Sequence, residues 1–324
     1  MNFITVVVFF FVSENERHLY NEVLGKKANV IFLKDINKEN RTAELEKADI
    51  LLTWNVPMEL VGAEKTPFKR LRFVQLLSAG YDHLDFNILP GNCLIAANQG
   101  AYAEPMAEHT VAMILALYKR LLINHNKMLL GEFDQSTPNR SLKNSIAGII
   151  GFGGIGKAVS ALLKNFGVKT FAINTTGSTG SEVDFIGTLN DLDYVLNKSD
   201  IVILSLPLNN STKGLIGKRE LGLMKTNAML INIARGNLVV EKDLFEHLVS
   251  NSEFSAGIDA WWTEPFKHGD FRLNFPFLGL PNVLGSPHNS AIIPGSLFAG
   301  QKKAVDNIIN FIEDKPLRGI VKRD

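Results

Sequence analysis

Short apolar runs alternate with amphipathic stretches along the first third of the chain. The apolar runs predict buried strands at residues 4–12, 29–33, 50–53 and 72–76. Stretches with one apolar face predict helices at residues 14–24 and 41–47. Strands that alternate with helices build a parallel sheet covered on both faces. We therefore expect the first third to form an α/β domain.

The pattern changes at residues 106–122, where apolar residues fall on nearly every side of a predicted helix. Pro105 suits the first turn of that helix, because an N–H at this position has no intrahelical partner. A helix that is apolar all round is buried, either in its own chain or against a second copy. We expect this helix to link two domains and to form a contact in a homodimer. A polar connection follows at residues 131–144.

A second alternating series follows the long helix. It predicts strands at residues 146–150, 168–173, 201–206, 228–233, 254–258 and 283–285. It predicts helices at residues 155–166, 192–197 and 241–249, and a closing helix at 297–313 that can return to the first domain. The two series together predict an α/β fold of two doubly wound parallel-sheet domains.

The strand at residues 146–150 runs into a glycine-rich turn, Gly151-Phe152-Gly153-Gly154-Ile155-Gly156, that opens a helix. In a dinucleotide-binding turn the three spaced glycines permit the tight turn, the approach of a pyrophosphate and close packing of helix on strand. The phosphates then rest on amide hydrogens at the positive helix end. Glycines can also serve packing alone, but here the flanking strands and helix have the lengths of a nucleotide site. We expect a Rossmann domain in residues 99–292, and a flavodoxin-like substrate domain in residues 1–98 and 293–324.

The residue that closes the second strand of a Rossmann domain reads the adenosine ribose. NAD-specific sites place Asp or Glu there to hold the 2′-hydroxyl. This chain has Asn174, followed by the hydroxyl side chains of Thr175 and Thr176. Because no carboxylate repels a 2′-phosphate, we expect NAD(P) as cofactor with a preference for NADP. No arginine lies in this loop, so NAD stays open as the alternative.

Three polar residues follow predicted strand ends in the second domain: Arg235, Glu264 and His288. In an open parallel sheet, ligands bind beyond the carboxyl ends of the strands, so the three are expected to converge near the cofactor. Arg offers a planar, charged fork to a carboxylate, and His donates a proton near neutral pH. A carboxylate beside the histidine would hold the ring. These types suit reduction of a 2-oxoacid, although an ion pair, a turn cap and a structural histidine are the respective alternatives.

The composition of the chain limits the classes of partner that are expected. Hydrophobic residues make up 46% and charged residues 21%, and the formal net charge is +1, so neither nucleic acid nor an anionic membrane is expected as a partner. Cys93 is the single cysteine, which excludes an internal disulfide and an all-cysteine metal site. No metal site is predicted, and the cysteine usage suits a reducing cytoplasm, where we expect the protein to act.

Further motifs occur in a fixed order across nearly the whole chain. They are Ser78-Ala79-Gly80-Tyr81-Asp82, Ala107-Glu108-His109, the glycine turn, Ser199-Asp200, Leu206-Pro207, Ala234-Arg235-Gly236, Asp259 with Glu264-Pro265, and Pro287-His288. In these motifs, their order and their spacing the chain resembles the D-isomer-specific 2-hydroxyacid dehydrogenases. That family includes glyoxylate reductases, hydroxypyruvate reductases and phosphoglycerate dehydrogenases.

The resemblance implies roles for individual residues. Arg235 would bind the substrate carboxylate and carbonyl, and His288 would be the acid in reduction and the base in oxidation, with Glu264 as its partner. The backbone at Ser78, Ala79 and Gly80 would also hold the carboxylate. The implied cofactor contacts are Thr110, Gly151, Gly153, Gly154, Ile155, Gly156, Asn174, Thr175, Thr176, Leu206, Pro207, Thr212, Ile233, Ala234, Arg235, Asp259, His288 and Ser290. Of these, Asp259 and the Ala234 carbonyl would hold the nicotinamide amide.

The chain departs from the family pattern at Trp261 and Trp262, where smaller residues are usual. Their rings are expected either to narrow the substrate pocket or to pack at a subunit contact. The role of Trp54 stays open. The side chain of the substrate cannot be deduced from these residues.

The hypothesis is an NAD(P)-dependent D-2-hydroxyacid dehydrogenase that reduces a small 2-oxoacid, with histidine as acid and base. One alternative is a cofactor-sensing binding protein on the same fold, as in transcriptional corepressors that resemble this family. Another is a dehydrogenase of a different small anion, such as formate or phosphite. The acid–base histidine favours a carbonyl–alcohol pair over formate.

Overall fold

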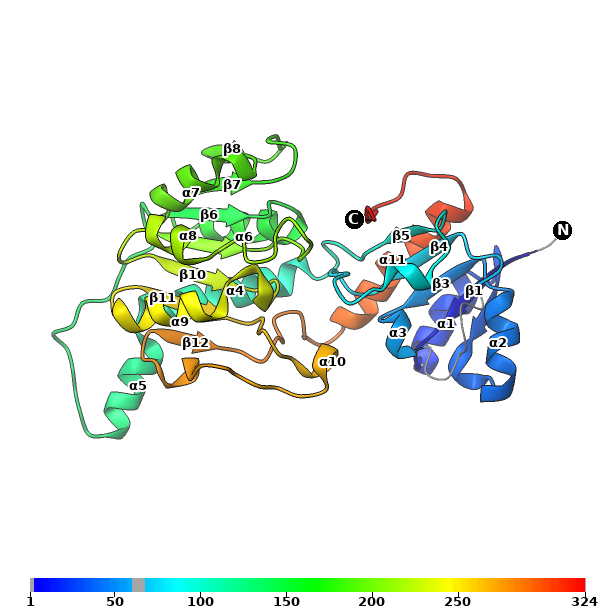
Figure 1. Ribbon diagram of the computed structural model, residues 1–324, viewed down its shortest axis with the longest axis horizontal. Coiled ribbons are helices and arrows are strands. Elements are labelled where there is room, and N and C mark those ends of the chain that lie inside the picture. The colour runs from blue at the N-terminus through cyan, green and yellow to red at the C-terminus, as the bar shows by residue number, and fades with distance from the viewer. Residues whose placement is uncertain (1–2, 60–67, 324) are drawn as a thin grey trace. The chain divides into compact units, whose positions relative to one another are not determined.

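The computed structural model describes residues 3–59 and 68–323 of the 324-residue chain. The chain forms two compact units (Figure 1). Unit 1 comprises Met1–Ala101 and Ile293–Asp324, and unit 2 comprises Tyr102–Ile292. Unit 2 is therefore a continuous segment, whereas unit 1 is assembled from both ends of the chain. No helix of the described residues is long and apolar enough to cross a membrane.

Unit 1 is a parallel sheet in the order β2-β1-β3-β4-β5 with helices around it. Its strands are β1 (Ile4–Val8), β2 (Ala28–Phe32), β3 (Ile50–Thr53), β4 (Phe73–Leu76) and β5 (Leu94–Ala96). Its helices are α1 (Glu14–Val23), α2 (Lys38–Glu46), α3 (Val56–Glu59) and α11 (Ser296–Ile312). Helix α11 packs against β4 and α1, so the closing helix of the sequence completes this unit.

Both faces of the unit 1 sheet are buried, as a parallel sheet requires. Neighbouring residues of one strand point to opposite faces, so Val7 belongs to one apolar cluster while Val6 and Val8 belong to the other. The second cluster includes Val305 and Ile308 of α11. Each fully buried aliphatic side chain of this kind contributes roughly 1.5–3 kcal/mol to folding.

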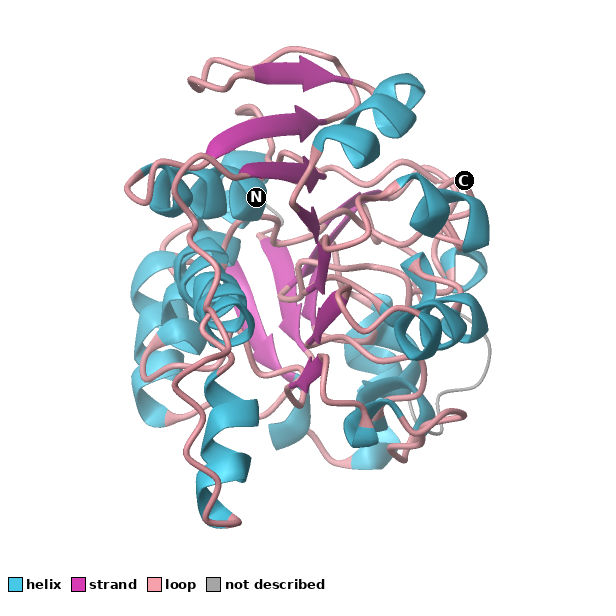
Figure 2. Ribbon diagram, turned by 90° about the vertical axis from the view of Figure 1, so that its left-hand side faces the viewer, coloured by secondary structure: helices cyan, strands magenta, loops and turns pink. Residues whose placement is uncertain are grey.

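Unit 2 is a parallel sheet in the order β12-β11-β10-β9-β6-β7-β8. Its strands are β6 (Ile146–Ile150), β7 (Lys169–Ile173), β8 (Phe185–Gly187), β9 (Ile201–Leu204), β10 (Met229–Asn232), β11 (Ser255–Ile258) and β12 (Val283–Gly285). Its helices are α4 (Ala103–Tyr118), α5 (Leu121–Leu129), α6 (Gly154–Lys164), α7 (Leu192–Lys198), α8 (Lys218–Leu223), α9 (Glu241–Ser250) and α10 (Pro265–His268). Helices cover both faces of the sheet (Figure 2). The predicted α/β fold with two parallel sheets is confirmed.

The strand order of unit 2 reverses beside its first strand. From β6 the chain proceeds outward to β7 and β8, and then returns to β9 on the other side of β6. Ligands of open α/β sheets bind beyond the carboxyl ends of the strands at such a reversal. The fold therefore marks the carboxyl edge near β6 and β9 as the place for a nucleotide.

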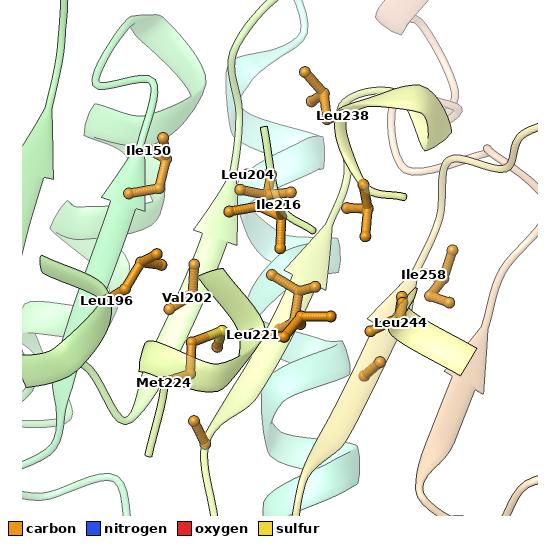
Figure 3. Close-up of a cluster of buried hydrophobic side chains, with 14 of the residues drawn as sticks. Ile150, Leu196, Val202, Leu204, Ile216, Leu221, Met224, Leu238, Leu244 and Ile258 are labelled. Atoms are coloured by element: carbon orange, nitrogen blue, oxygen red, sulfur yellow. The ribbon is translucent and has the colours of Figure 1, made fainter. Parts of the chain in front are cut away.

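The unit 2 core lies between this sheet and the helices α7, α8 and α9. Figure 3 shows Ile150, Val202 and Leu204 of the strands facing Leu221 and Leu244 of the helices. These five side chains are at most 1% exposed. Because these side chains are fully packed, the ends of the strands are held in place, and each following loop begins at a defined position.

The predicted extent of the long helix, residues 106–122, is wrong, because the structure has two helices there. Helix α4 ends at Tyr118, and Arg120 adopts the left-handed conformation with φ 52° before α5 begins. Arg140, from the polar connection, explains the break: its N–H donates to the Tyr118 carbonyl at 3.0 Å, and its guanidinium lies 4.2 Å from the Tyr118 ring centroid. Lys119 Nζ in turn donates to the Arg140 carbonyl at 2.7 Å. A distant residue thus ends the helix.

Other differences concern short elements. The first strand ends at Val8 rather than at residue 12. Strands β5 and β8, with three residues each, and helix α8, with six, were not predicted. Elements of this length show too few positions for a period of 2 or 3.6 to emerge from the sequence.

Candidate active site

The glycine turn follows β6 at the carboxyl edge of unit 2. Gly151 has φ +101°, and a Cβ on it would lie 2.6 Å from the carbonyl carbon and oxygen of Ser205. A Cβ on Gly156 would lie 2.6 Å from the Gly151 carbonyl oxygen. Ser205 Oγ also donates to that oxygen at 2.9 Å. These two glycines are required because backbone segments approach each other where a side chain would stand.

Gly153 has a different environment. No atom of the described residues lies within 4 Å of a Cβ built on it, so its surface is open. It is the N-cap of α6, and the amide hydrogens of Gly154, Ile155 and Gly156 lie in the first turn, where a helix offers them no acceptor. Open space above unpaired amides at a positive helix end fits the pyrophosphate of a dinucleotide.

The loop after β7 is organised by the side chain of Asn174. Its Oδ1 accepts hydrogen bonds from the backbone N–H groups of Thr176 at 3.0 Å and Gly177 at 2.7 Å. Its Nδ2 donates to the Ser178 carbonyl at 2.8 Å. Asn174 thus shapes the loop, while Thr175 and Thr176 are exposed on it. NAD sites carry a carboxylate at this position. This chain has a neutral amide there, and its oxygen and nitrogen both form hydrogen bonds within the same loop.

Predicted residues after β9 and on α4 are likewise held by local bonds. Thr212 Oγ1 donates to the Pro207 carbonyl at 2.8 Å and accepts from the Asn209 N–H at 2.9 Å, which closes the loop. Leu206 is buried in the unit 2 core. Thr110 is buried too, and its Oγ1 donates to the Met106 carbonyl one turn earlier at 2.7 Å.

Arg235, Glu264 and His288 follow the neighbouring strands β10, β11 and β12. The structure brings Glu264 and His288 together: Nδ1 of His288 lies 2.9 Å from Oε1 and 2.7 Å from Oε2 of Glu264. The side chain of His288 is 31% exposed and that of Glu264 is 17% exposed, so the pair is partly shielded from solvent but accessible to a substrate. A carboxylate on Nδ1 sets the tautomer and the orientation of the ring.

His288 lies in a left-handed conformation, with φ 51°. Few residues with a side chain adopt this conformation, so the turn needs anchors. Asp259, which is fully buried, supplies some of them. Its carboxylate accepts from Ser286 Oγ at 2.6 Å, and from the N–H groups of Asn289 at 3.2 Å and Ser290 at 3.3 Å. Asp259 therefore holds the turn that carries His288.

His109 of α4 joins this network, which the sequence did not reveal. Its Nε2 lies 3.0 Å from Ser286 Oγ and 3.7 Å from Asp259 Oδ1. No catalytic role is predicted for His109 from the sequence, although the motif Ala107-Glu108-His109 sets it apart. Ser290 Oγ, next to the network, is buried and has no hydrogen-bond partner among the described residues.

Arg235 stands in a tight turn after β10. The Asn232 side chain holds this turn, accepting from the Ala234 N–H at 3.1 Å and donating to the Arg235 carbonyl at 2.9 Å. Arg235 itself is half-buried, and its Nη1 donates to the Ala234 carbonyl at 2.7 Å. A Cβ on Gly236 would lie 2.3 Å from the Trp261 carbonyl carbon, so this turn packs directly on the segment that precedes Glu264.

The two tryptophans after β11 are both buried in unit 2. Trp261 is 5% and Trp262 8% exposed. Trp262 stacks on Phe277, with ring centroids 5.2 Å apart. Both rings therefore belong to the core of unit 2.

The remaining predicted residues lie in unit 1. Ser78, Ala79 and Gly80 follow β4, and Ser78 Oγ donates to the Gly80 carbonyl at 2.7 Å. The neighbouring strand β3 ends at Thr53, whose hydroxyl bonds to Glu59. Burial raises the pKa of Glu59 above its usual value. The loop of Ser78, Ala79 and Gly80 thus lies at the carboxyl edge of the unit 1 sheet.

Residues 111–290 match the sequence profile described as "D-isomer specific 2-hydroxyacid dehydrogenase, NAD binding domain". The chain belongs to this family. It is accordingly an NAD(P)-dependent enzyme, and unit 2 of this 2-hydroxyacid dehydrogenase family member is its NAD(P)-binding domain. The matched region contains the glycine turn, Asn174, Arg235 and the Glu264–His288 pair.

Individual relatives agree with the family. The glycerate dehydrogenase of Methylorubrum extorquens is 29% identical over 286 residues, which cover 86% of this chain and 87% of that protein. Glyoxylate/hydroxypyruvate reductase B of Pectobacterium carotovorum is 32% identical over 247 residues, covering 74% and 75%. The crystal structure of a D-isomer specific 2-hydroxyacid dehydrogenase family protein from Aeromonas salmonicida superposes with a TM-score of 0.77 at 25% identity, covering 99% of both chains.

The two kinds of glycine predict opposite effects of the same substitution. In Gly153→Ala the new methyl group enters open space, so the urea midpoint stays unchanged while the Kd for the dinucleotide rises by at least about tenfold, or about 1.4 kcal/mol. In Gly151→Ala the methyl group meets the Ser205 backbone, so stability falls by about 2 kcal/mol or more. Fluorescence titration and urea unfolding measure the two quantities. Unchanged affinity in Gly153→Ala contradicts the placement of the phosphates.

Proposed function

We propose that this enzyme is a D-2-hydroxyacid dehydrogenase that works as a reductase of a small 2-oxoacid such as glyoxylate or hydroxypyruvate. The contact of His288 with Glu264 carries the proposal, because it provides a ring nitrogen fixed for proton transfer beside the NAD(P)-binding edge. Relatives named glycerate dehydrogenase, hydroxypyruvate reductase and glyoxylate reductase support the substrate class.

In the proposed reduction, Glu264 holds Nδ1 of His288, and the opposite nitrogen, Nε2, gives its proton to the carbonyl oxygen of the substrate. Arg235 binds the substrate carboxylate through its planar fork. The backbone at Ser78, Ala79 and Gly80 is proposed to bind the same carboxylate. The bound nicotinamide supplies the hydride that reduces C2, and the protein contributes placement and electrostatics.

The proposed cofactor contacts spread along the carboxyl edge of unit 2. The amides of Gly154, Ile155 and Gly156 hold the pyrophosphate, Gly153 leaves room for it, and Gly151 shapes their turn. The loops at Leu206, Pro207 and Thr212 line the adenosine side. The Ala234 carbonyl, Asp259 and Ser290 Oγ are proposed to hold the nicotinamide amide, and Thr110 and Ile233 are proposed as further contacts on that side. Ser290 Oγ is suited to this because it has no hydrogen-bond partner in the described part of the chain.

The first test replaces the acid. His288→Gln removes the proton donor but keeps a polar side chain of similar length, so kcat for 2-oxoacid reduction falls by about 10²–10⁴-fold. The dinucleotide Kd stays within about twofold of the wild type, because the phosphate site is untouched. A panel of glyoxylate, hydroxypyruvate and formate with both cofactors, followed at the nicotinamide absorbance, measures the activity.

His18→Gln is the matched control, since that side chain is 80% exposed on α1. Retained turnover in His288→Gln contradicts the acid role. Turnover of formate alone, or of nothing in the panel, contradicts the reductase.

We further propose that NADPH is preferred over NADH. Asn174 brings no negative charge toward a 2′-phosphate, and Thr175 places an exposed hydroxyl beside it. The exposed hydroxyls of Thr176 and Ser178 also lie in this loop, where they form hydrogen bonds within the loop. The absence of an arginine from this loop limits the strength of the preference.

Asn174→Asp tests this preference directly. An aspartate keeps the oxygen that accepts from Thr176 and Gly177 but adds a charge, and two like unit charges at 4 Å repel by about 1–4 kcal/mol. The ratio of kcat/KM for NADPH to that for NADH therefore falls by at least about tenfold. Steady-state kinetics with both cofactors measures it.

Asn251→Asp is the control, because Asn251 also caps a turn, accepting from the Glu253 N–H and donating to the Thr226 carbonyl, but precedes β11 at the opposite sheet edge. An NADH preference in the wild type contradicts the proposal, as does an equal response of both variants.

We also propose a homodimer, with its contact on α5 rather than on the predicted long helix at α4. Helix α4 packs against α6, β10 and β11, which accounts for much of its apolar surface. Helix α5 has no buried residue, yet it and the following loop expose large apolar side chains. These are Leu121, Leu122, Met128, Leu129, Leu130 and Phe133. An exposed apolar patch of this kind fits a second copy of the chain.

The double substitution Leu122→Glu with Leu129→Glu places charges seven residues apart on one face of α5. Light scattering should then give the mass of one chain, 35.8 kDa, in place of two. Val249→Glu, an exposed apolar position on α9, should leave the dimer intact. A monomeric wild type contradicts the dimer, and a dimeric double variant contradicts the placement on α5.

A further inference from the structure

We propose that Trp261 is a positioning residue that fixes Glu264 and His288 relative to each other. It belongs to the segment between β11 and Glu264, and it contacts both turns of the pair. Its effect on catalysis rests on the proposed function, whereas its effect on the geometry of the pair does not.

The backbone of Trp261 holds the carboxylate. Its N–H donates to Oε1 of Glu264 at 2.6 Å, and the same oxygen lies 2.9 Å from Nδ1 of His288. One carboxylate oxygen is thus shared between the Trp261 amide and the histidine ring. Any displacement of residue 261 therefore moves the partner of the histidine.

The side chain of Trp261 holds the other turn. Its indole Nε1–H donates to the Ser286 carbonyl at 2.8 Å, two residues before His288. The ring also covers the end of β12, since a Cβ on Gly285 would lie 2.8 Å from its Cζ2 atom. Because the ring is nearly fully buried, water has little access to the indole end of this bond.

The left-handed turn at His288 is the reason such an anchor matters. Asp259 fixes the residues after the histidine through the N–H groups of Asn289 and Ser290. Trp261 fixes the carbonyl before it, at Ser286, whose hydroxyl also bonds to Asp259. The strained residue is therefore held from both sides. Trp261 connects this turn to that of Glu264 through a single residue, with its backbone bonded on one side and its ring on the other.

The neighbouring residue provides a matched control. Trp262 is equally buried, and its Nε1–H donates to a backbone carbonyl at the same distance of 2.8 Å. That carbonyl belongs to Val239, which precedes α9, and the ring stacks on Phe277. Removing the indole N–H at either position costs one buried hydrogen bond, but only the bond at Trp261 leads to the turn of His288.

The experiment compares Trp261→Phe with Trp262→Phe. Both lose one indole donor and keep an aromatic ring, so similar losses of stability are expected in urea unfolding. In Trp261→Phe we expect kcat for 2-oxoacid reduction to fall by about tenfold with the dinucleotide Kd within about twofold, because misplacement of reacting groups affects turnover rather than cofactor binding. Trp262→Phe should keep the wild-type kcat.

A second readout does not depend on turnover. The hydrogen-bonded Nδ1 proton of His288 is expected to give a low-field proton NMR signal, identified by its absence in His288→Gln. This signal should broaden or shift in Trp261→Phe and persist in Trp262→Phe. A wild-type signal together with wild-type kcat in Trp261→Phe overturns the proposal, as do equal changes in both variants. If the wild-type enzyme reduces no 2-oxoacid, the proposed function fails, and the NMR comparison alone decides the role of Trp261.

Discussion

The parallel pairing of seven strands in unit 2 is the constraint on which the site depends. Because all these strands run the same way, the loop after each one leaves the sheet at the same edge. The glycine turn follows β6, Asn174 follows β7, and the catalytic candidates follow β10, β11 and β12. Parallel strands need long crossover connections between them, so residues that act together are far apart in the sequence. His288 and Glu264 are separated by 24 positions and still share a hydrogen bond.

The loops at this edge of the sheet are further constrained because their backbones approach one another closely. At Gly151, Gly156, Gly236 and Gly285, a single added carbon would lie within 3 Å of another backbone segment or ring. These glycines allow the loops to pack directly against one another. Each loop is therefore positioned by its neighbour as well as by its own strand. Gly153 is the exception, because its open surface faces outward. The same motif therefore contains residues that serve packing and a residue that leaves room for a ligand.

The sequence predicted the two parallel sheets, the glycine turn and the approach of Glu264 to His288, because these depend on local periodicity and on motifs with fixed spacing. It did not predict the end of α4, where neither Lys119 nor Arg120 is a helix breaker and the cause is Arg140. The sequence also did not reveal that the side-chain amide of Asn174 forms hydrogen bonds within its own loop. The role of Trp261 was equally hidden, because it depends on bonds to Glu264 and Ser286 that exist only after folding. Local patterns specify elements, whereas tertiary hydrogen bonds decide how individual side chains are used.

The discontinuity of unit 1 has a consequence for the order in which the protein is made. The strands of unit 1 leave the ribosome before unit 2, but the apolar face formed by Val6, Val8 and Phe73 is covered by α11, which is synthesised after unit 2. Unit 2, as a continuous segment between them, has all its strands available before α11 emerges. Unit 2 can therefore fold while unit 1 still exposes an uncovered sheet. During translation that sheet is the part of the chain most in need of protection from aggregation.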